Sequence, residues 1–163
     1  IDRLIDVIKL VPDVRVIIAG NDEEDLTPKL RVQAEQNGVA DRVGFRGPVS
    51  GAAKEELLQT STALVLPSLS ENFGNVILEA MAAEMPVIVT PEVGLAAEVA
   101  QSGAGIVTSG LPEPLSQAIR GLLDDSELRA AMGKRGRELV NARFTWDYVA
   151  AQMEEQYRRI TKR

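Results

Sequence analysis

The chain has 163 residues, of which 45% are hydrophobic and 26% charged, so it is long enough to bury a core and fits one compact domain. It contains neither cysteine nor histidine, which excludes disulfides, thiolate metal sites and chemistry that depends on an imidazole base. The formal net charge of −6 argues against binding to duplex nucleic acid or to an anionic membrane, because both require clustered Lys and Arg.

The first residues have helical spacing. Ile1, Leu4, Ile5, Ile8 and Val11 recur as on one face of a helix, and neither a Met nor a capping residue precedes them. We therefore interpret the chain as a fragment of a longer protein. No apolar run reaches the roughly 20 residues that span a bilayer, and no segment has a signal-peptide pattern, so the cytoplasm is the default compartment.

Five short runs typical of strands alternate with helical patterns. The runs lie at residues 14–20, 42–47, 63–68, 86–91 and 105–109. Alternation of strand and helix predicts a parallel sheet with helices on both faces, and nearly continuous apolar runs are typical of strands that are buried on both faces. The expected fold is a Rossmann-like, doubly wound α/β domain with five to six parallel strands, followed by C-terminal helices.

Beyond residue 110 the pattern is wholly helical. Thr145 is the expected N-cap of the last helix. One face of this helix is apolar and consists of Trp146, Val149, Met153, Tyr157 and Ile160. We expect that face to pack on another domain, or to drive self-association of the fragment when that domain is absent.

Ligands of open parallel sheets bind outside the carboxyl ends of the strands, so the loops that follow the strands are the candidate sites. The acidic loop at 20–25, "GNDEED", has oxygen ligands for Mg²⁺, although a solvated charge run is the commoner explanation. After the third run a helix is expected to begin near Gly74. Its free amides and the positive end of its dipole favour an anion such as phosphate. No G-x-G-x-x-G or Walker A sequence is present.

Two glutamates flank this helix start, eight residues apart. Glu71 lies in the loop, and Glu79 lies about one and a half turns inside the helix, among apolar neighbours. A buried carboxylate requires hydrogen-bond donors, and a vicinal diol supplies two of them. Two alternatives remain open: Glu79 points to solvent or pairs with an arginine, and Glu71 is an ordinary polar loop residue.

The stretch 68–90, "SLSENFGNVILEAMAAEMPVIVT", resembles the E-x7-E signature of the group 1 glycosyltransferases, family 4 of the retaining enzymes with the two-domain GT-B fold. Further similar segments are "IDRLIDVIKLVPDVRVIIAG", "RVGFRGPVS", "LVLPS", "PVIVTPEVGLAAEV" and "ARFTWDYVAAQMEEQYRRI". Residues 1–163 thus resemble the C-terminal, nucleotide-sugar-binding domain, which is one half of a GT-B fold.

The resemblance implies a role for each matched residue. Glu71 would be the catalytic residue, and the donor sugar would contact Glu71, Asn72, Phe73 and Gly74. The diphosphate would contact Asn75 and Val76, the ribose Glu79, and the nucleobase Gly47 and Val49. The implied reaction is retaining transfer of a hexosyl group from a nucleotide-diphosphate sugar, without a metal or other cofactor, in polysaccharide or glycoconjugate biosynthesis.

The resemblance also implies what the chain lacks. In the family, an Arg and a Lys that neutralise the diphosphate precede the first helix, on the first strand and its loop, and an acceptor-binding N-terminal domain precedes them. We therefore expect the isolated chain to be inactive and to bind nucleotide weakly, and any peripheral contact with the cytosolic membrane face to come from the absent domain. Gly94 stands alone where many relatives have two glycines, so a phosphate contact there is left open.

Two other functions remain open. A nucleotide-sugar epimerase of the GT-B type would use a similar donor pocket for another reaction. A non-catalytic module that binds nucleotide sugars would need the pocket alone. The spacing of the two glutamates and the sequence segments around them favour the transferase.

Overall fold

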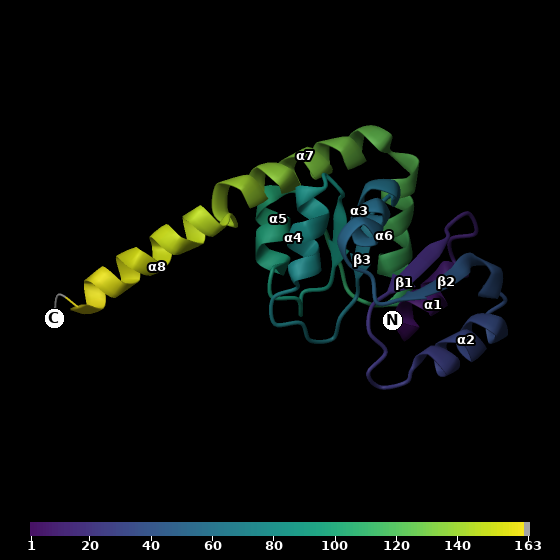
Figure 1. The fold of residues 1–163 in the computed structure, drawn as a ribbon. Coiled ribbons are helices and arrows are strands. Elements are labelled where there is room, and N and C mark those ends of the chain that lie inside the picture. The colour runs from purple at the N-terminus through teal and green to yellow at the C-terminus, as the bar shows by residue number, and fades with distance from the viewer. Residues whose placement is uncertain (162–163) are drawn as a thin grey trace.

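The computed structural model describes residues 1–161, which form an α/β domain with helices on both faces of parallel strands (Figure 1). The strands are β1 (Val16–Ala19), β2 (Val43–Gly47), β3 (Leu64–Leu66), β4 (Val87–Val89) and β5 (Gly105–Val107). The helices are α1 (Asp2–Ile8), α2 (Thr27–Gln36), α3 (Gly51–Thr60), α4 (Asn75–Ala82), α5 (Ala96–Ser102), α6 (Pro112–Asp124), α7 (Ser126–Arg143) and α8 (Trp146–Thr161), and a short 3-10 helix spans Ala40–Arg42. Each strand lies within the run predicted for it, and all the pairings are parallel, as expected.

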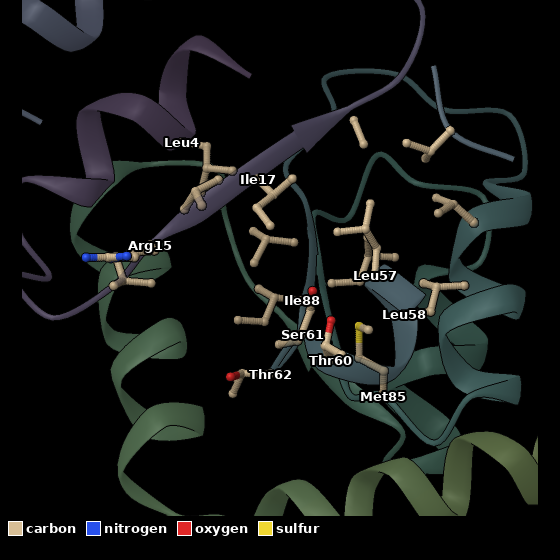
Figure 2. A pocket seen from close by; sticks show the side chains of 18 of the residues that line it. Leu4, Arg15, Ile17, Leu57, Leu58, Thr60, Ser61, Thr62, Met85 and Ile88 are labelled. Carbon is tan, nitrogen blue, oxygen red and sulfur yellow. The ribbon is translucent and has the colours of Figure 1, made fainter. Parts of the chain in front are cut away.

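The strands form two sheets instead of the single sheet expected from the sequence. β1 pairs with β2, and β3, β4 and β5 pair in that order. A cavity of about 820 Å³ lies between the two sheets (Figure 2). Paired strands lie about 4.8 Å apart, and β1 and β3 are not hydrogen-bonded to each other. The doubly wound arrangement is therefore interrupted at one place, between β1 and β3.

The three-stranded sheet is covered on both faces. Val87 and Val89 of β4 pack with residues of α4 and α5 in one apolar cluster. Ile88, which points to the opposite face, packs with α1 and α6 in a second cluster. All three residues of β4 are buried, in agreement with the apolar run in the sequence.

The two-stranded sheet is covered more thinly. Val16 and Ile18 of β1 pack with α1 and α2. Ile17, on the opposite face, is 46% exposed and lines the cavity, where Figure 2 shows it near Leu4. The predicted burial of strands on both faces thus holds for β4 and is wrong for β1.

Close contact between α7 and α4 explains two glycines in the segment "MGKRGRELV". A Cβ atom at Gly133 would lie 1.9 Å from the carbonyl oxygen of Glu84, and one at Gly136 would lie 3.0 Å from Cβ of Met81. Side chains at these positions would force the helices apart. The segment lies inside α7, and its glycines allow the helices to pack closely.

Helix α8 extends away from the rest of the molecule (Figure 1). Oγ1 of Thr145 accepts a hydrogen bond from the amide of Tyr148 at 3.3 Å, which confirms the predicted N-cap. The predicted apolar face is exposed along the whole helix, with Trp146 at 88% and Ile160 at 69%. Among residues 1–161, no helix has the length and apolar content needed to cross a membrane.

Candidate functional site

The cavity between the sheets is open along the length of β1 and β3. At the amino ends of these strands it is lined by Arg15 and Thr62, which Figure 2 labels. At the carboxyl ends it is lined by Gly20, Val49 and Glu79. Because ligands of parallel sheets bind at the carboxyl ends, this second end is the candidate site.

The first turn of α4 presents backbone amides at this end of the strands. Gly74 is the N-cap and has φ 84° and ψ 62°, a left-handed conformation that favours glycine. A Cβ atom there would lie 2.9 Å from Cδ1 of Ile77. The helix therefore begins where the sequence predicts. The amides of Asn75 and Val76, in the first turn, lack intrahelical acceptors by the geometry of a helix.

The loop that carries Glu71 is joined to the loop that follows β4. The amide of Glu71 donates to the carbonyl of Glu92 at 3.2 Å, and the amide of Gly94 donates to the carbonyl of Glu71 at 2.8 Å. A Cβ atom at Gly94 would lie 2.0 Å from the carbonyl oxygen of Asn72. Gly94 thus allows two loops to pack backbone against backbone, a role that sequence reasoning missed.

The Glu71 carboxylate is turned toward its own loop. Oε1 of Glu71 accepts a hydrogen bond from the amide of Phe73 at 3.2 Å. The ring of Phe73 meets that of Phe144 edge to face, with centroids 6.4 Å apart. These contacts fix the loop between β3 and α4 from two sides.

Glu79 is neither buried nor unpaired, so the expectation that its carboxylate is buried is wrong. Its side chain is 39% exposed, and Oε1 lies 2.7 Å from Nζ of Lys54, on α3. The alternative that Glu79 pairs with a cation is correct in kind, but the cation is a lysine. Ile77, Ala80 and Met81 are the buried residues of α4, and Glu79 lies on the side that faces α3 and the cavity.

The residues expected at the nucleobase are placed differently from each other. Gly47 has φ 65°, and its carbonyl accepts a hydrogen bond from the amide of Gly20 at 2.9 Å, which extends the pairing of β1 with β2. Val49 lines the cavity beside Pro48. Ser50 is the N-cap of α3.

The acidic loop after β1 serves to cap α2. The carboxylate of Asp22 accepts hydrogen bonds from the amides of Leu26, at 2.7 Å, and Thr27, at 3.0 Å. Hydrogen bonds from Thr27 and then Leu26 hold the pKa of Asp22 below its ordinary value of 3.8. Within residues 1–161, no group of three or more His, Cys, Asp and Glu side chains is arranged to hold a metal ion.

The structure brings part of the predicted site together around the cavity. Val49, Val76 and Glu79 line it, although they follow two different strands. The other predicted residues lie beyond the lining of the cavity. Gly47 is the last residue of β2, and the rest lie in the loop before α4 and at its start: Glu71, Asn72, Phe73, Gly74 and Asn75. The two groups are joined by the first turn of α4. Lys54 is the residue at this site that sequence reasoning missed, since nothing in the local pattern reveals a pairing between residues 25 positions apart.

Most of the chain is similar in sequence to known proteins. A family model described as glycosyl transferases group 1 matches residues 1–139. The chain is 33% identical over 159 residues to a D-inositol 3-phosphate glycosyltransferase of Corynebacterium urealyticum, covering 94% of this chain and 37% of that protein. It is 32% identical over 152 residues to a phosphatidyl-myo-inositol mannosyltransferase of Mycolicibacterium smegmatis, covering 92% of this chain and 38% of that protein. The chain therefore spans less than two fifths of the length of these relatives.

The same fold occurs in solved structures of other proteins. The sucrose-phosphate synthase of Thermosynechococcus elongatus superposes with a TM-score of 0.86 at 29% identity, over 99% of this chain and 42% of that chain. Alr3699/HepE of Anabaena, in complex with UDP and glucose, superposes with a TM-score of 0.85 at 26% identity, over 95% of this chain and 43% of that chain. The fold expected from the resemblance, the C-terminal half of a GT-B protein, is thereby confirmed. On the match to residues 1–139 and on these relatives, the chain belongs to the group 1 glycosyltransferase family.

Proposed function

We propose that this chain holds the nucleotide-diphosphate sugar donor of a glycosyltransferase that transfers a hexosyl group to an acceptor with retention. The observation that carries the proposal is the meeting of Val49, Val76 and Glu79 at the carboxyl ends of β1 and β3, beside the first turn of α4. The family supports the reaction class, and the Anabaena relative in complex with UDP and glucose supports the donor class.

The donor would lie along the first turn of α4. Its diphosphate would accept hydrogen bonds from the amides of Asn75 and Val76, where the helix dipole favours negative charge. Val49 and Gly47 would contact the nucleobase, and Glu79 would accept hydrogen bonds from the two ribose hydroxyls.

The sugar would lie at the loop before α4. Glu71, whose carboxylate now accepts the amide of Phe73, would exchange that hydrogen bond for hydroxyls of the sugar, and Asn72, Phe73 and Gly74 would contribute backbone groups. We assign Glu71 as the catalytic residue because it would touch the transferred sugar. Negative charge that develops on the departing diphosphate would be stabilised by the helix amides, a mechanism that requires no metal.

We also propose that the intact protein adds a strand and a domain to this chain. The cavity separates two parallel sheets and is lined by apolar side chains of β1 and β3, including Val16, Ile17 and Val65. Leu4 of α1 lines it as well. A parallel strand that enters this space and leads into α1 would form a right-handed β-α-β unit with β1, joining the two sheets. The acceptor would bind to the further domain, and without that domain the isolated chain would be inactive.

Calorimetry on the intact protein tests the donor site. UDP, GDP and ADP are titrated into the wild type, the variant Glu79→Ala and the control Glu56→Ala, which changes an exposed glutamate on α3. If Glu79 holds the ribose, Glu79→Ala weakens the nucleotide that binds by about 1 to 3 kcal/mol, the range for hydrogen bonds to a charged group. The control should bind like the wild type. Equal affinities of all three proteins would contradict the assignment of Glu79.

A further inference from the structure

The ion pair between Lys54 and Glu79 joins two helices that begin at the candidate site. α3 follows β2 and α4 follows β3, so both helices start at the carboxyl ends of the strands. Nζ of Lys54 lies 2.7 Å from Oε1 of Glu79, and both side chains line the cavity between the sheets. The pair therefore lies where a donor would approach the chain.

Stability alone gives little reason for this pair. The side chains of Lys54 and Glu79 are 37% and 39% exposed, and ion pairs at such exposure contribute little to the free energy of folding. The apolar residues of α4 already fix the helix in the core. An explanation in terms of ligand binding is therefore the stronger one.

The geometry of the pair suits a carboxylate that must hold a diol. Among the hydrogen bonds of residues 1–161, Oε1 of Glu79 takes that of Lys54 and Oε2 takes none. A free glutamate side chain samples many rotamers, and ordering it on binding lowers the affinity. Lys54 removes much of that freedom in advance and leaves Oε2 available to a ligand.

The positive charge of Lys54 also offsets the repulsion between the Glu79 carboxylate and the diphosphate in the proposed site. Glu79 would bind the ribose of a ligand whose diphosphate is negative, in a chain with a net charge of −6. Like charges at short range repel, more strongly in a partly shielded cavity than in bulk water. The cavity has a second cation, Arg15, but it lies at the opposite end, before β1. Lys54 is thus the cation of the cavity lining that lies next to Glu79.

We propose that Lys54 is a positioning residue for the nucleotide, which orients the Glu79 carboxylate toward the ribose hydroxyls and neutralises it beside the diphosphate. The inference rests on the proposed function, since it assumes that Glu79 meets the ribose. It adds a residue from α3 to a site otherwise built from the loops and from α4. It also predicts that discrimination between ribose and deoxyribose depends on a side chain that need not touch the sugar.

The test compares UDP with 2′-deoxy-UDP by calorimetry on the intact protein. The variants are Lys54→Met, which removes the charge, Lys54→Arg, which keeps it, and the control Lys29→Met on the exposed face of α2. We expect Lys54→Met to bind UDP about tenfold more weakly and to lose most of the preference for UDP over 2′-deoxy-UDP. Lys54→Arg should retain most of the affinity for UDP and most of the preference for UDP over 2′-deoxy-UDP. Lys29→Met should match the wild type. In the double variant Lys54→Met/Glu79→Gln, the loss should equal that of Glu79→Gln alone.

Several outcomes overturn the proposal and separate it from the proposed function. If the wild type prefers UDP and Lys54→Met keeps the same preference, Lys54 has no positioning role while the donor site stands. If Lys54→Met binds UDP more tightly, Lys54 competes with the ligand for Glu79. If the wild type binds UDP without preferring the ribose, the role of Glu79 fails and this proposal with it. If the wild type binds none of UDP, GDP and ADP, the donor site itself is refuted.

Melting temperatures without ligand should agree among the variants. A large drop in melting temperature for Lys54→Met alone would show that the ion pair has a structural role.

Discussion

The two sheets of this domain differ in how far their packing is complete. In the three-stranded sheet, β4 is buried on both faces, by α4 and α5 on one side and by α1 and α6 on the other. In the two-stranded sheet, β1 is covered by α1 and α2 on one face, while Ile17 on the other face is 46% exposed toward the cavity. The three-stranded sheet is therefore covered by residues of this chain on both faces, whereas the two-stranded sheet leaves one apolar face partly exposed.

The largest expected difference between the two sheets follows from shortening one isoleucine in each of them. Ile88 of β4 is 1% exposed, so Ile88→Ala should lower the free energy of unfolding by about 2 to 5 kcal/mol, through lost burial and a cavity. Ile17→Ala, in β1, should cost less than about 1.5 kcal/mol because much of that side chain is already exposed. Urea unfolding at neutral pH measures both. Equal losses would show that Ile17 is covered in solution.

A matched pair of glycine substitutions tests the packing of α7 against α4, which covers the three-stranded sheet. At Gly133 a Cβ atom would meet the backbone of Glu84 at 1.9 Å, whereas at Gly121, on α6, nothing lies within 4 Å. Gly133→Ala should therefore destabilise the protein by about 1 to 3 kcal/mol, through displacement of α7 from α4. Gly121→Ala should be stabilising by up to about 1 kcal/mol, from helix propensity. Thermal unfolding of the two variants should shift in opposite directions, and a shift in the same direction would contradict the contact.

The smallest expected effect on stability concerns Asp6, which links α1 to α2, the two helices that cover the two-stranded sheet. Oδ1 of Asp6 accepts hydrogen bonds from Asn37, at 2.8 Å, and from Gln33, at 2.9 Å. Asn37 first and then Gln33 hold the pKa of Asp6 below its ordinary value of 3.8. Because the pKa is lower in the folded state, the stabilisation is present above pH 4 or so and is lost as the pH falls through the folded pKa.

The variant Asp6→Asn keeps an acceptor and removes the titration. Urea midpoints of the wild type and of Asp6→Asn are compared at pH 7 and at pH 3. The advantage of the wild type should shrink at the lower pH. An advantage that stays constant, or grows in acid, would show that Asp6 does not titrate with a lowered pKa.

Much of the fold could be predicted from the sequence, because its signals are local. Apolar runs marked all five strands, and the start of α4 at Gly74 and the N-cap at Thr145 followed from the preferences of single residues. The interruption between β1 and β3 could not be predicted, since it depends on which strands become neighbours in space. The roles of Gly133 and Gly136 in α7 could not be predicted either, because these glycines contact Glu84 and Met81, which are far away in sequence.

The candidate site divides in the same way. The loop and helix that carry Glu71 and Glu79 were identified from one contiguous stretch, and the structure puts Val49, Val76 and Glu79 around one cavity. The burial expected for Glu79 was wrong. Apolar neighbours along the helix suggested burial, but successive residues of a helix point in different directions, and Glu79 faces Lys54 of α3. Pairings across elements need the tertiary structure.

The junction at Gly94 has a mechanical consequence. The loop after β3 and the loop after β4 are tied by backbone hydrogen bonds from Glu71 to Glu92 and from Gly94 to Glu71, and the hydroxyl of Thr90 donates to the carbonyl of Ser68 at 2.5 Å. Neither loop can swing without breaking these bonds or dragging the other. A displacement of Glu71 is thus transmitted to the end of β4, the most deeply buried strand. The two loops are therefore expected to move together as one rigid unit and not independently.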